Sequence, residues 1–168
     1  MIVVMMGVTG SGKTTIGELL AKKIGAAFAD ADDYHSAANK RKMAAGHPLN
    51  DEDRQPWLET LNGVMRGWFE AGGNGVLACS ALKQRYRDIL ASGIPEGSLH
   101  FVWLDGSPDL LAKRLAARHH EYMNPSLLKS QFDTLEVPAG ALHVVNDLSP
   151  DDVVDGILQK LPSGQRSK

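Results

Sequence analysis

The chain has 168 residues, a net charge of -2 and a single cysteine, Cys79. This length predicts one domain over residues 1–168, long enough to bury a core. The weak charge argues against nucleic-acid binding, and a lone cysteine excludes an internal disulfide and favours a reducing compartment. No apolar run reaches the about 20 residues of a membrane span, and no signal-peptide start is visible. We therefore expect a cytoplasmic protein with neither a nucleic-acid nor a membrane partner.

Short apolar runs alternate with helical patterns along the chain. The predicted elements are, in chain order, a strand MIVVMM, a helix through Ile16 and Ile24 that ends at Gly25, a strand AAFAD, a polar helical segment, a long helix through Trp57 and Phe69, a strand GVLACS, a helix through Tyr86 and Leu90, a strand LHFVWLD, a helix from Ser107 through Leu115, a short helix through Leu127 and Leu135, a strand ALHVVN and a last helix from Ser149 through Leu158. Five buried strands separated by helices predict an α/β fold of three layers, a parallel, doubly wound sheet with helices on both faces.

The segment GVTGSGKT, residues 7–14, matches the phosphate-binding loop (P-loop) pattern G-x-x-x-x-G-K-[ST] at every position. It lies between a buried strand and an amphipathic helix, where backbone N–H groups can surround phosphate oxygens. Lys13 is expected to reach the β- and γ-phosphates, and the Thr14 hydroxyl to ligate Mg²⁺. The motif predicts a bound nucleoside triphosphate with magnesium, held by Gly7, Val8, Thr9, Gly10, Ser11, Gly12, Lys13, Thr14 and Thr15.

Two common classes of P-loop protein fit the rest of the chain poorly. A GTPase switch needs N-K-x-D, and the nearest string, residues 39–42, ends in lysine. A larger ATPase needs a strand ending in a metal-binding acid, which FVWLD imitates with Asp105. By chain order, however, this fourth strand lies on the other side of the P-loop strand. A small kinase is the remaining class.

The stretch FADADDYH places three acids directly after the second strand. If the chain stays extended through Asp32, the two-residue period puts Asp30 and Asp32 on one side and Asp33 on the other. Beside a magnesium-phosphate site, Asp30 is then predicted to hold the hydrated metal, and Asp32 to accept a proton from an attacking hydroxyl. The alternative is a set of solvated turn acids that cap the helix beginning near Tyr34.

Several blocks of sequence closely resemble the gluconokinase family. With the P-loop they are FADADDYHSAANKRKMAAGHPLNDEDRQPWL, CSALKQRYRDIL, RLAAR and SQFDTLEVP, and they cover most of the chain from Met5 to Pro138 in the family's order. The resemblance implies a P-loop kinase fold with a helical lid, a homodimer, and transfer of the γ-phosphate of ATP to the 6-hydroxyl of D-gluconate. The family pattern matches Asp30 and Asp32 as an Asp-x-Asp pair and usually has an apolar residue at the position of Asp33.

A gluconate site needs a cation for the carboxylate and short polar groups for the hydroxyls. Guanidinium pairs with carboxylate in a bidentate way, which favours Arg54, although Arg54 has the alternative of pairing with Asp51 or Asp53. The predicted substrate residues are Asp32, His35, Lys42, Arg54, Ser80, Lys83 and Arg87.

The segment RLAARHHEYMNP is predicted to begin a lid over about residues 114–136. Arg114 and Arg118 are four residues apart, so on a helix they share a face and can reach one anion. We expect Arg114 to bind the nucleotide and Arg118 to join Lys13 and Asp32 as a catalytic residue. The alternative is a solvated basic helix face. The tail, residues 162–168, is expected to be frayed.

Two other functions compete with gluconate phosphorylation. Shikimate kinase is a small P-loop kinase whose glycine triplet should follow the third strand, whereas the glycines of residues 72–75 precede it. A nucleotide-dependent regulatory module would keep the P-loop and bind ATP without transferring phosphate.

Overall fold

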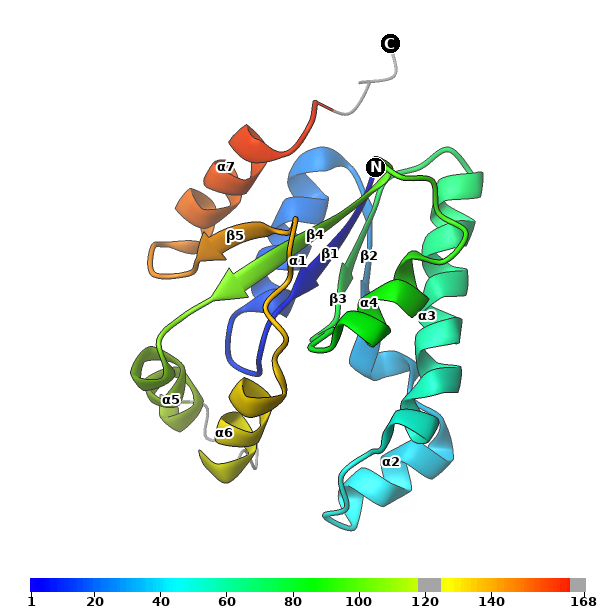
Figure 1. Cartoon of the computed structure of the whole chain (residues 1–168). Coiled ribbons are helices and arrows are strands. Elements are labelled where there is room, and N and C mark those ends of the chain that lie inside the picture. Colours follow the sequence, from blue (N-terminus) through cyan, green and yellow to red (C-terminus); the bar gives the residue numbers. More distant parts are fainter. Residues whose placement is uncertain (118–124, 164–168) are drawn as a thin grey trace.

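Five strands form one parallel sheet in the order β2-β3-β1-β4-β5 (Figure 1). The strands are β1 (Ile2–Met6), β2 (Ala27–Asp30), β3 (Gly75–Ala78), β4 (Leu99–Asp105) and β5 (Leu142–Val145). The computed structural model describes residues 1–117 and 125–163, without the side chains of residues 125–127. The predicted parallel, five-stranded sheet is confirmed. Arg118 and the tail from residue 164 lie outside the described residues.

Helices cover both faces of the sheet, as predicted. The helical segments are α1 (Lys13–Ile24), the short 3-10 helix η1 (Ala31–Tyr34), α2 (Ala37–Ala44), α3 (Asp51–Glu70), α4 (Gln84–Ala91), α5 (Pro108–Ala117), α6 (Pro125–Thr134) and α7 (Pro150–Lys160). Helices α3 and α4 pack on one face, and α1 and α7 on the other (Figure 1). None of the described helices is both long and apolar enough to span a membrane.

The central strand β1 is buried along its whole length because it has apolar side chains on both faces. Val4 and Met6 face the core under α3, while Val3 and Met5 face the core under α1 and α7. A strand of a parallel sheet with both faces covered has a continuous run of apolar residues. The run MIVVMM predicted such a strand. The P-loop that follows β1 therefore starts from a rigid position.

A third apolar cluster fixes α5 and α6 beyond the carboxyl ends of the strands (Figure 1). Val8 of the P-loop, Leu111 of α5 and Leu128 of α6 are buried there, and Leu115 and Phe132 pack against them. The two helices of the predicted lid region thus share a core with the phosphate-binding loop.

The fourth strand lies on the far side of β1 from β3, as chain order predicted. Asp105 at its end is bound by His143 of β5, with Nε2 and Oδ2 2.8 Å apart, and its other oxygen accepts from the Gly106 N–H. Asp105 does not line the P-loop cavity described below. Asp105 is thus engaged by β5 and by its own turn, and the view that it only imitates the metal-binding acid of an ATPase stays a prediction.

The expectation that the chain stays extended through Asp32 is wrong. Strand β2 ends at Asp30, and residues 31–34 form η1. The Asp30 carboxylate accepts a hydrogen bond from the Asp32 N–H at 3.0 Å and so caps this short helix. An acid that satisfies an unpaired N–H at a helix start competes with continued extension. The capping alternative thus holds in part, although the helix begins at Ala31 rather than near Tyr34.

Gly75 at the start of β3 offers a test of how tightly α3 packs on the sheet. A Cβ at this position would lie 2.0 Å from Cε3 of Trp68. We expect Gly75→Ala to lower the free energy of unfolding by about 1–3 kcal/mol through overpacking. Gly63→Ala is the matched control, because nothing lies within 4 Å of the place that the new methyl group would take on α3, and it should stabilise by about 0.5–1 kcal/mol. Urea unfolding of both variants measures the difference, and equal effects would contradict the packing argument.

Candidate active site

A cavity of about 430 Å³ lies where the carboxyl ends of β1, β2 and β3 meet. Ligands of open α/β sheets bind at this edge. Most of its lining is polar and comes from the P-loop and from the ends of β2 and β3, with one further residue from α6. The lining residues are Thr9, Gly10, Gly12, Lys13, Thr14, Thr15, Asp30, Asp32, Ala78, Cys79, Ser80 and Gln131.

Two glycines of the P-loop have positions that no side chain can share. Gly7 has a φ of 148°, and a Cβ there would lie 2.5 Å from the Leu104 carbonyl oxygen. Gly12 has a φ of 96°, and its Cβ would lie 2.5 Å from Nδ2 of Asn146. The motif glycines are therefore required by the neighbouring strands β4 and β5 as well as by the turn itself.

Asn146, directly after β5, holds the P-loop from outside the motif. Its buried side chain donates from Nδ2 to the Ser11 carbonyl oxygen at 2.6 Å. Its own carbonyl accepts a hydrogen bond from the Arg114 guanidinium. The predicted nucleotide-binding residue Arg114 is thus attached to the loop through Asn146. Sequence reasoning missed Asn146, and the available signal was its place at the carboxyl end of a strand.

Lys13 and Thr14 already have partners within the site. The Lys13 Nζ donates to the carbonyl oxygens of Gly7 and Val8 at 2.9 and 3.1 Å. The Thr14 hydroxyl donates to Oδ2 of Asp30 at 2.8 Å. A hydroxyl and a carboxylate side by side next to a phosphate-binding loop are the hard oxygen ligands that suit Mg²⁺, which keeps several waters. The predicted metal residues Thr14 and Asp30 therefore lie together.

Asp32 lines the cavity beside Asp30, whereas Asp33 does not. Desolvation raises the pKa of Asp32 above its ordinary value, the Asp30 carboxylate raises it further, and the Lys13 charge opposes both. The predicted pairing of Asp30 with Asp32 in one site is met, but through the turn of η1 rather than through strand alternation. A carboxylate whose pKa is raised is a better proton acceptor.

His35 continues the site away from the P-loop. Its ring stacks on Trp57 with 4.2 Å between ring centroids, and Trp57 donates from Nε1 to the Ala31 carbonyl oxygen at 2.7 Å. Desolvation lowers the pKa of His35 and so favours the neutral ring, while the charge of Asp32 raises it and that of Arg54 lowers it. Asp32 and Arg54 therefore each lie near enough to His35 to shift its pKa, so His35 lies between two of the other predicted substrate residues in its electrostatic contacts.

The three predicted cations before α4 have different partners. Lys42 pairs with Asp53 at 2.6 Å, and Lys83 pairs with Asp51 at 3.2 Å. Arg54 donates instead to the Leu49 carbonyl oxygen at 2.7 Å and to the Tyr86 hydroxyl at 3.3 Å. Among the described residues Arg54 has no carboxylate within salt-bridge distance. The alternative in which Arg54 pairs with Asp51 or Asp53 is thus not found.

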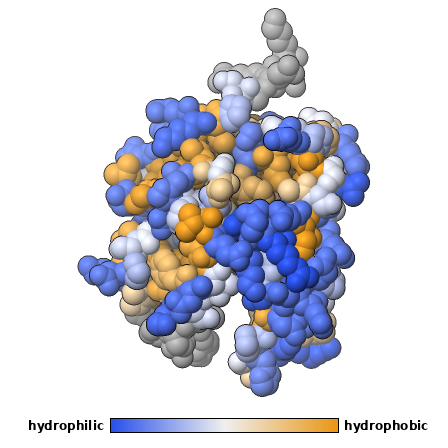
Figure 2. All heavy atoms as spheres, in the orientation of Figure 1, coloured by the Kyte–Doolittle hydropathy of each residue, from blue (hydrophilic) through white to orange (hydrophobic). Residues whose placement is uncertain are grey.

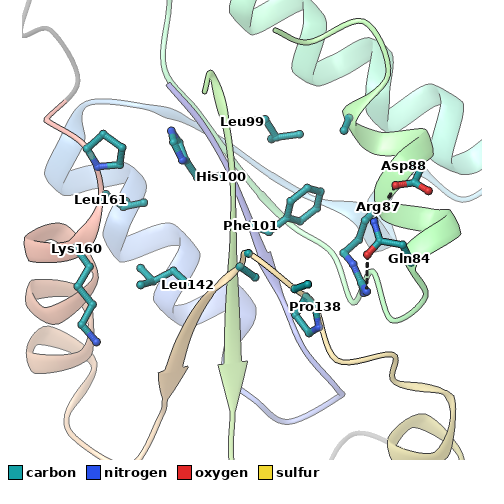
Figure 3. Close-up of a pocket in the computed structure, with 15 residues that line it drawn as sticks. Gln84, Arg87, Asp88, Leu99, His100, Phe101, Pro138, Leu142, Lys160 and Leu161 are labelled. Carbon is teal, nitrogen blue, oxygen red and sulfur yellow. Dashed lines mark hydrogen bonds between the residues drawn. The ribbon is translucent and has the colours of Figure 1, made fainter. Parts of the chain in front are cut away.

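Ser80 and Arg87, predicted together, lie in different places. Ser80 lines the cavity, and its carbonyl oxygen accepts from the Gly7 N–H at 3.2 Å. Arg87 is only 3% exposed and donates to the carbonyl oxygens of Ala81 at 2.7 Å and Glu136 at 2.9 Å. It lines a separate hollow of about 510 Å³ between α4, β4 and the end of α7 (Figure 3). The arrangement does not bring Arg87 to the P-loop cavity, because its guanidinium ties these two loop carbonyls together.

The surface around the site is divided into two sides. Figure 2 shows hydrophilic side chains over α2 and the neighbouring part of α3, and a notch between them and the side formed by α5 and α6.

Cys79 lines the cavity but is buried, and desolvation raises the pKa of its thiol to about 12, so it is no nucleophile at neutral pH.

Comparisons with known proteins agree with this architecture. The chain is 47% identical to a probable gluconokinase of Xenopus tropicalis, over 89% of this chain and 88% of that protein. It is 39% identical to the thermoresistant gluconokinase of Escherichia coli, over 94% of this chain and 89% of that protein. The crystal structure of a gluconokinase from Sinorhizobium meliloti 1021 has a TM-score of 0.84 and 40% identity, over 95% of this chain and 90% of that one. The chain belongs to the gluconokinase family.

The shikimate kinase family model also matches, over residues 9–160. A shikimate kinase structure from Aquifex aeolicus is 16% identical with a TM-score of 0.57, which shows a common fold alone. Membership of the gluconokinase family and the shikimate kinase match together establish a P-loop kinase with a nucleotide-binding loop. The assignment of individual site residues stays a prediction, and Arg118 lies outside the described residues.

The raised pKa of Asp32 predicts a pH-dependent cost in stability. As pH rises, Asp32 loses its proton near its ordinary pKa of about 3.9 in the unfolded chain, but only at a higher pH in the folded protein. The free energy of unfolding therefore falls as pH rises between these two pKa values. We expect Asp32→Asn to abolish the fall and to be more stable than the wild type at pH 7, by at most about 1 kcal/mol because Asp32 is partly solvated. The difference should vanish near pH 3, below about the ordinary pKa.

Thermal unfolding at both pH values measures this effect. Glu96→Gln removes a carboxylate from an exposed loop and is the control. A gain for Asp32→Asn that is equal at both pH values would show that desolvation of the carboxylate is not its cause.

Proposed function

We propose that this protein transfers the γ-phosphoryl group of ATP to the 6-hydroxyl of D-gluconate, giving 6-phospho-D-gluconate and ADP. The observation that carries the proposal is the Asp32 carboxylate inside the same cavity as a complete P-loop. It is supported by relatives named gluconokinases, which are 39–47% identical to this chain. A base beside the γ-phosphate site acts on a substrate whose hydroxyl group accepts the phosphoryl group, and gluconate supplies such a hydroxyl.

The nucleotide side of the reaction depends on the P-loop. Its backbone N–H groups and the start of α1 bind the phosphates, and Lys13 moves from the Gly7 and Val8 carbonyls to the β- and γ-phosphate oxygens. Mg²⁺ would be held by Thr14 and, through water, by Asp30, and when bound it neutralises charge on the phosphates. Arg114 binds the nucleotide, and Arg118 stabilises the charge that develops during transfer.

Asp32 acts on the acceptor. It orients the 6-hydroxyl and takes its proton as the new bond forms between that oxygen and the γ-phosphorus and as the bond to the leaving ADP breaks. The raised pKa brings Asp32 closer to the working pH, which strengthens it as a base. His35, stacked on Trp57 and held neutral, can donate or accept hydrogen bonds to the hydroxyls of the sugar acid.

Arg54 is the proposed partner of the gluconate carboxylate. Lys42 and Lys83 each face a carboxylate already, whereas the hydrogen-bond partners of Arg54 among the described residues are neutral. Its guanidinium lies 5.5 Å from the centre of the Tyr86 ring and hydrogen-bonds to the Leu49 carbonyl and the Tyr86 hydroxyl, and these contacts restrain it. A fork fixed in this way can receive a carboxylate in bidentate geometry with little loss of entropy. Ser80, Lys42 and Lys83 would contribute to the hydroxyl contacts.

The remaining parts of the proposal come from the family resemblance and the composition. They are a homodimer, a cytoplasmic location, magnesium as the metal, a lid over about residues 114–136, and no nucleic-acid or membrane partner. The net charge of -2 supports the absence of nucleic-acid binding.

An acceptor panel tests the function. We expect ADP release from Mg-ATP to rise strongly with D-gluconate and to stay at the background with shikimate or nucleoside monophosphates. Asp32→Asn is the inactive control, with turnover lower by about 10²–10⁴-fold and ATP binding retained, because it removes only the base. Stimulation by shikimate would replace the proposal, as the family model match allows. ATP binding without stimulation by any acceptor would indicate a regulatory module.

The role of Arg54 predicts a selective loss of substrate affinity. Arg54→Ala should raise KM for gluconate by about 10–100-fold, the worth of a hydrogen-bonded charge pair, and leave KM for ATP nearly unchanged. Arg66→Ala removes an exposed arginine of the same helix, paired with Glu70 at 3.7 Å, and should leave both constants unchanged. Steady-state kinetics with each substrate varied in turn gives the two values. Equal increases in both would remove Arg54 from the carboxylate site.

A further inference from the structure

Gln131 is the one described residue of α6 that lines the P-loop cavity. Every other described lining residue comes from the P-loop, the start of α1, η1 or the ends of β2 and β3. Gln131 lies 122 positions from Thr9 in the sequence, yet its Oε1 accepts a hydrogen bond from the Thr9 N–H at 2.6 Å. The side chain is half-buried, and its neighbours Leu128 and Phe132 anchor α6 in the apolar cluster with Val8. Its position beside the loop is therefore set by packing.

This hydrogen bond determines which way the amide is turned. A backbone N–H only donates, so Gln131 must present its oxygen to Thr9 and turn its NH₂ group elsewhere. Within the described part of the chain this NH₂ group has no hydrogen-bond partner. Two N–H donors thus remain available at the edge of a cavity built for phosphate oxygens.

The charges of the cavity favour a neutral donor at this point. Lys13 is the one cation among its described lining residues, and Asp30 and Asp32 are two acids. A transferring phosphoryl group carries negative charge on three oxygens, which donors on several sides stabilise. An amide supplies such a hydrogen bond without adding a further charge beside Lys13, Asp30 and Asp32. Its position is fixed before the reaction, so little reorganisation is needed.

We propose that Gln131 donates its side-chain N–H to the γ-phosphoryl group while its oxygen holds Thr9. Helix α6 then takes part in the reaction and also supports the P-loop. The inference deepens the proposed function and rests on it, because it names a further ligand of the phosphoryl group that is transferred. A γ-phosphate contact can nevertheless be measured without any acceptor.

Gln131→Glu separates the two parts of this role. Glutamate has the same length and keeps an oxygen that can accept from the Thr9 N–H, but it replaces the NH₂ donor by an anionic oxygen. We expect it to weaken binding of a non-hydrolysable ATP analogue by about tenfold or more, to change ADP affinity by less than about twofold, and to lower turnover by about 10²-fold. Its unfolding midpoint should match the wild type. Gln131→Ala loses both contacts and should also lose stability.

The measurement is calorimetric titration of each variant with ADP and with the ATP analogue, in magnesium. Gln159→Glu makes the same change of charge on the exposed face of α7 and should keep the wild-type ratio of the two affinities. If Gln131→Glu also keeps that ratio, Gln131 is a structural support of the loop alone and the proposal is wrong. Failure of the proposed function would appear separately, as wild-type protein that gains no turnover from gluconate, while the ratio of affinities would still decide the γ-phosphate contact.

Discussion

The hydrogen bond from Asn146 to the Ser11 carbonyl is the contact on which the rest of the site depends. A P-loop binds phosphate with its backbone, and within the loop region Lys13 and Val8 help to hold it, through hydrogen bonds to the Gly7 and Val8 carbonyls and through the apolar cluster with α5 and α6. The loop is also held from outside, with the Leu104 carbonyl against Gly7 and Asn146 against Gly12. Because these contacts come from the ends of β4 and β5, the loop has its binding geometry only when the whole sheet is formed.

Asp30 shows how one carboxylate can serve the fold and the chemistry at once. One oxygen caps η1 through the Asp32 N–H, and the other accepts from the Thr14 hydroxyl. The first contact ends the strand and turns Asp32 into the cavity, and the second places an acid next to the expected metal ligand. The two acids therefore take their positions from a single turn, which also brings their like charges close and adds to the rise in the pKa of Asp32 that desolvation causes.

Predictions from local sequence pattern were confirmed where the residues of a single strand or helix determine its structure. The apolar run of β1 and the stripe through Trp57 and Met65 carry their own burial pattern, so strand and helix could be identified directly. The prediction of an extended chain through Asp32 was wrong because a side-chain cap on a helix competes with continued extension. The two-residue period of a strand does not show which of these two conformations is more stable. Arg87 was grouped with the substrate residues by its distance along the chain, but its guanidinium binds two loop carbonyls that come together only in the fold.

The sequence by itself determined the α/β class, the succession of strands and helices along the chain, the P-loop and the resemblance to gluconokinases, since each depends on residues close together in the chain. Only the tertiary structure showed which distant residues hold the P-loop by hydrogen bonds. Gln131 and Asn146 reach it from 122 and 135 positions away, and Arg54 is singled out because its neighbours Lys42 and Lys83 have carboxylate partners. Such assignments depend on hydrogen bonds across distant elements, which local periodicity does not contain.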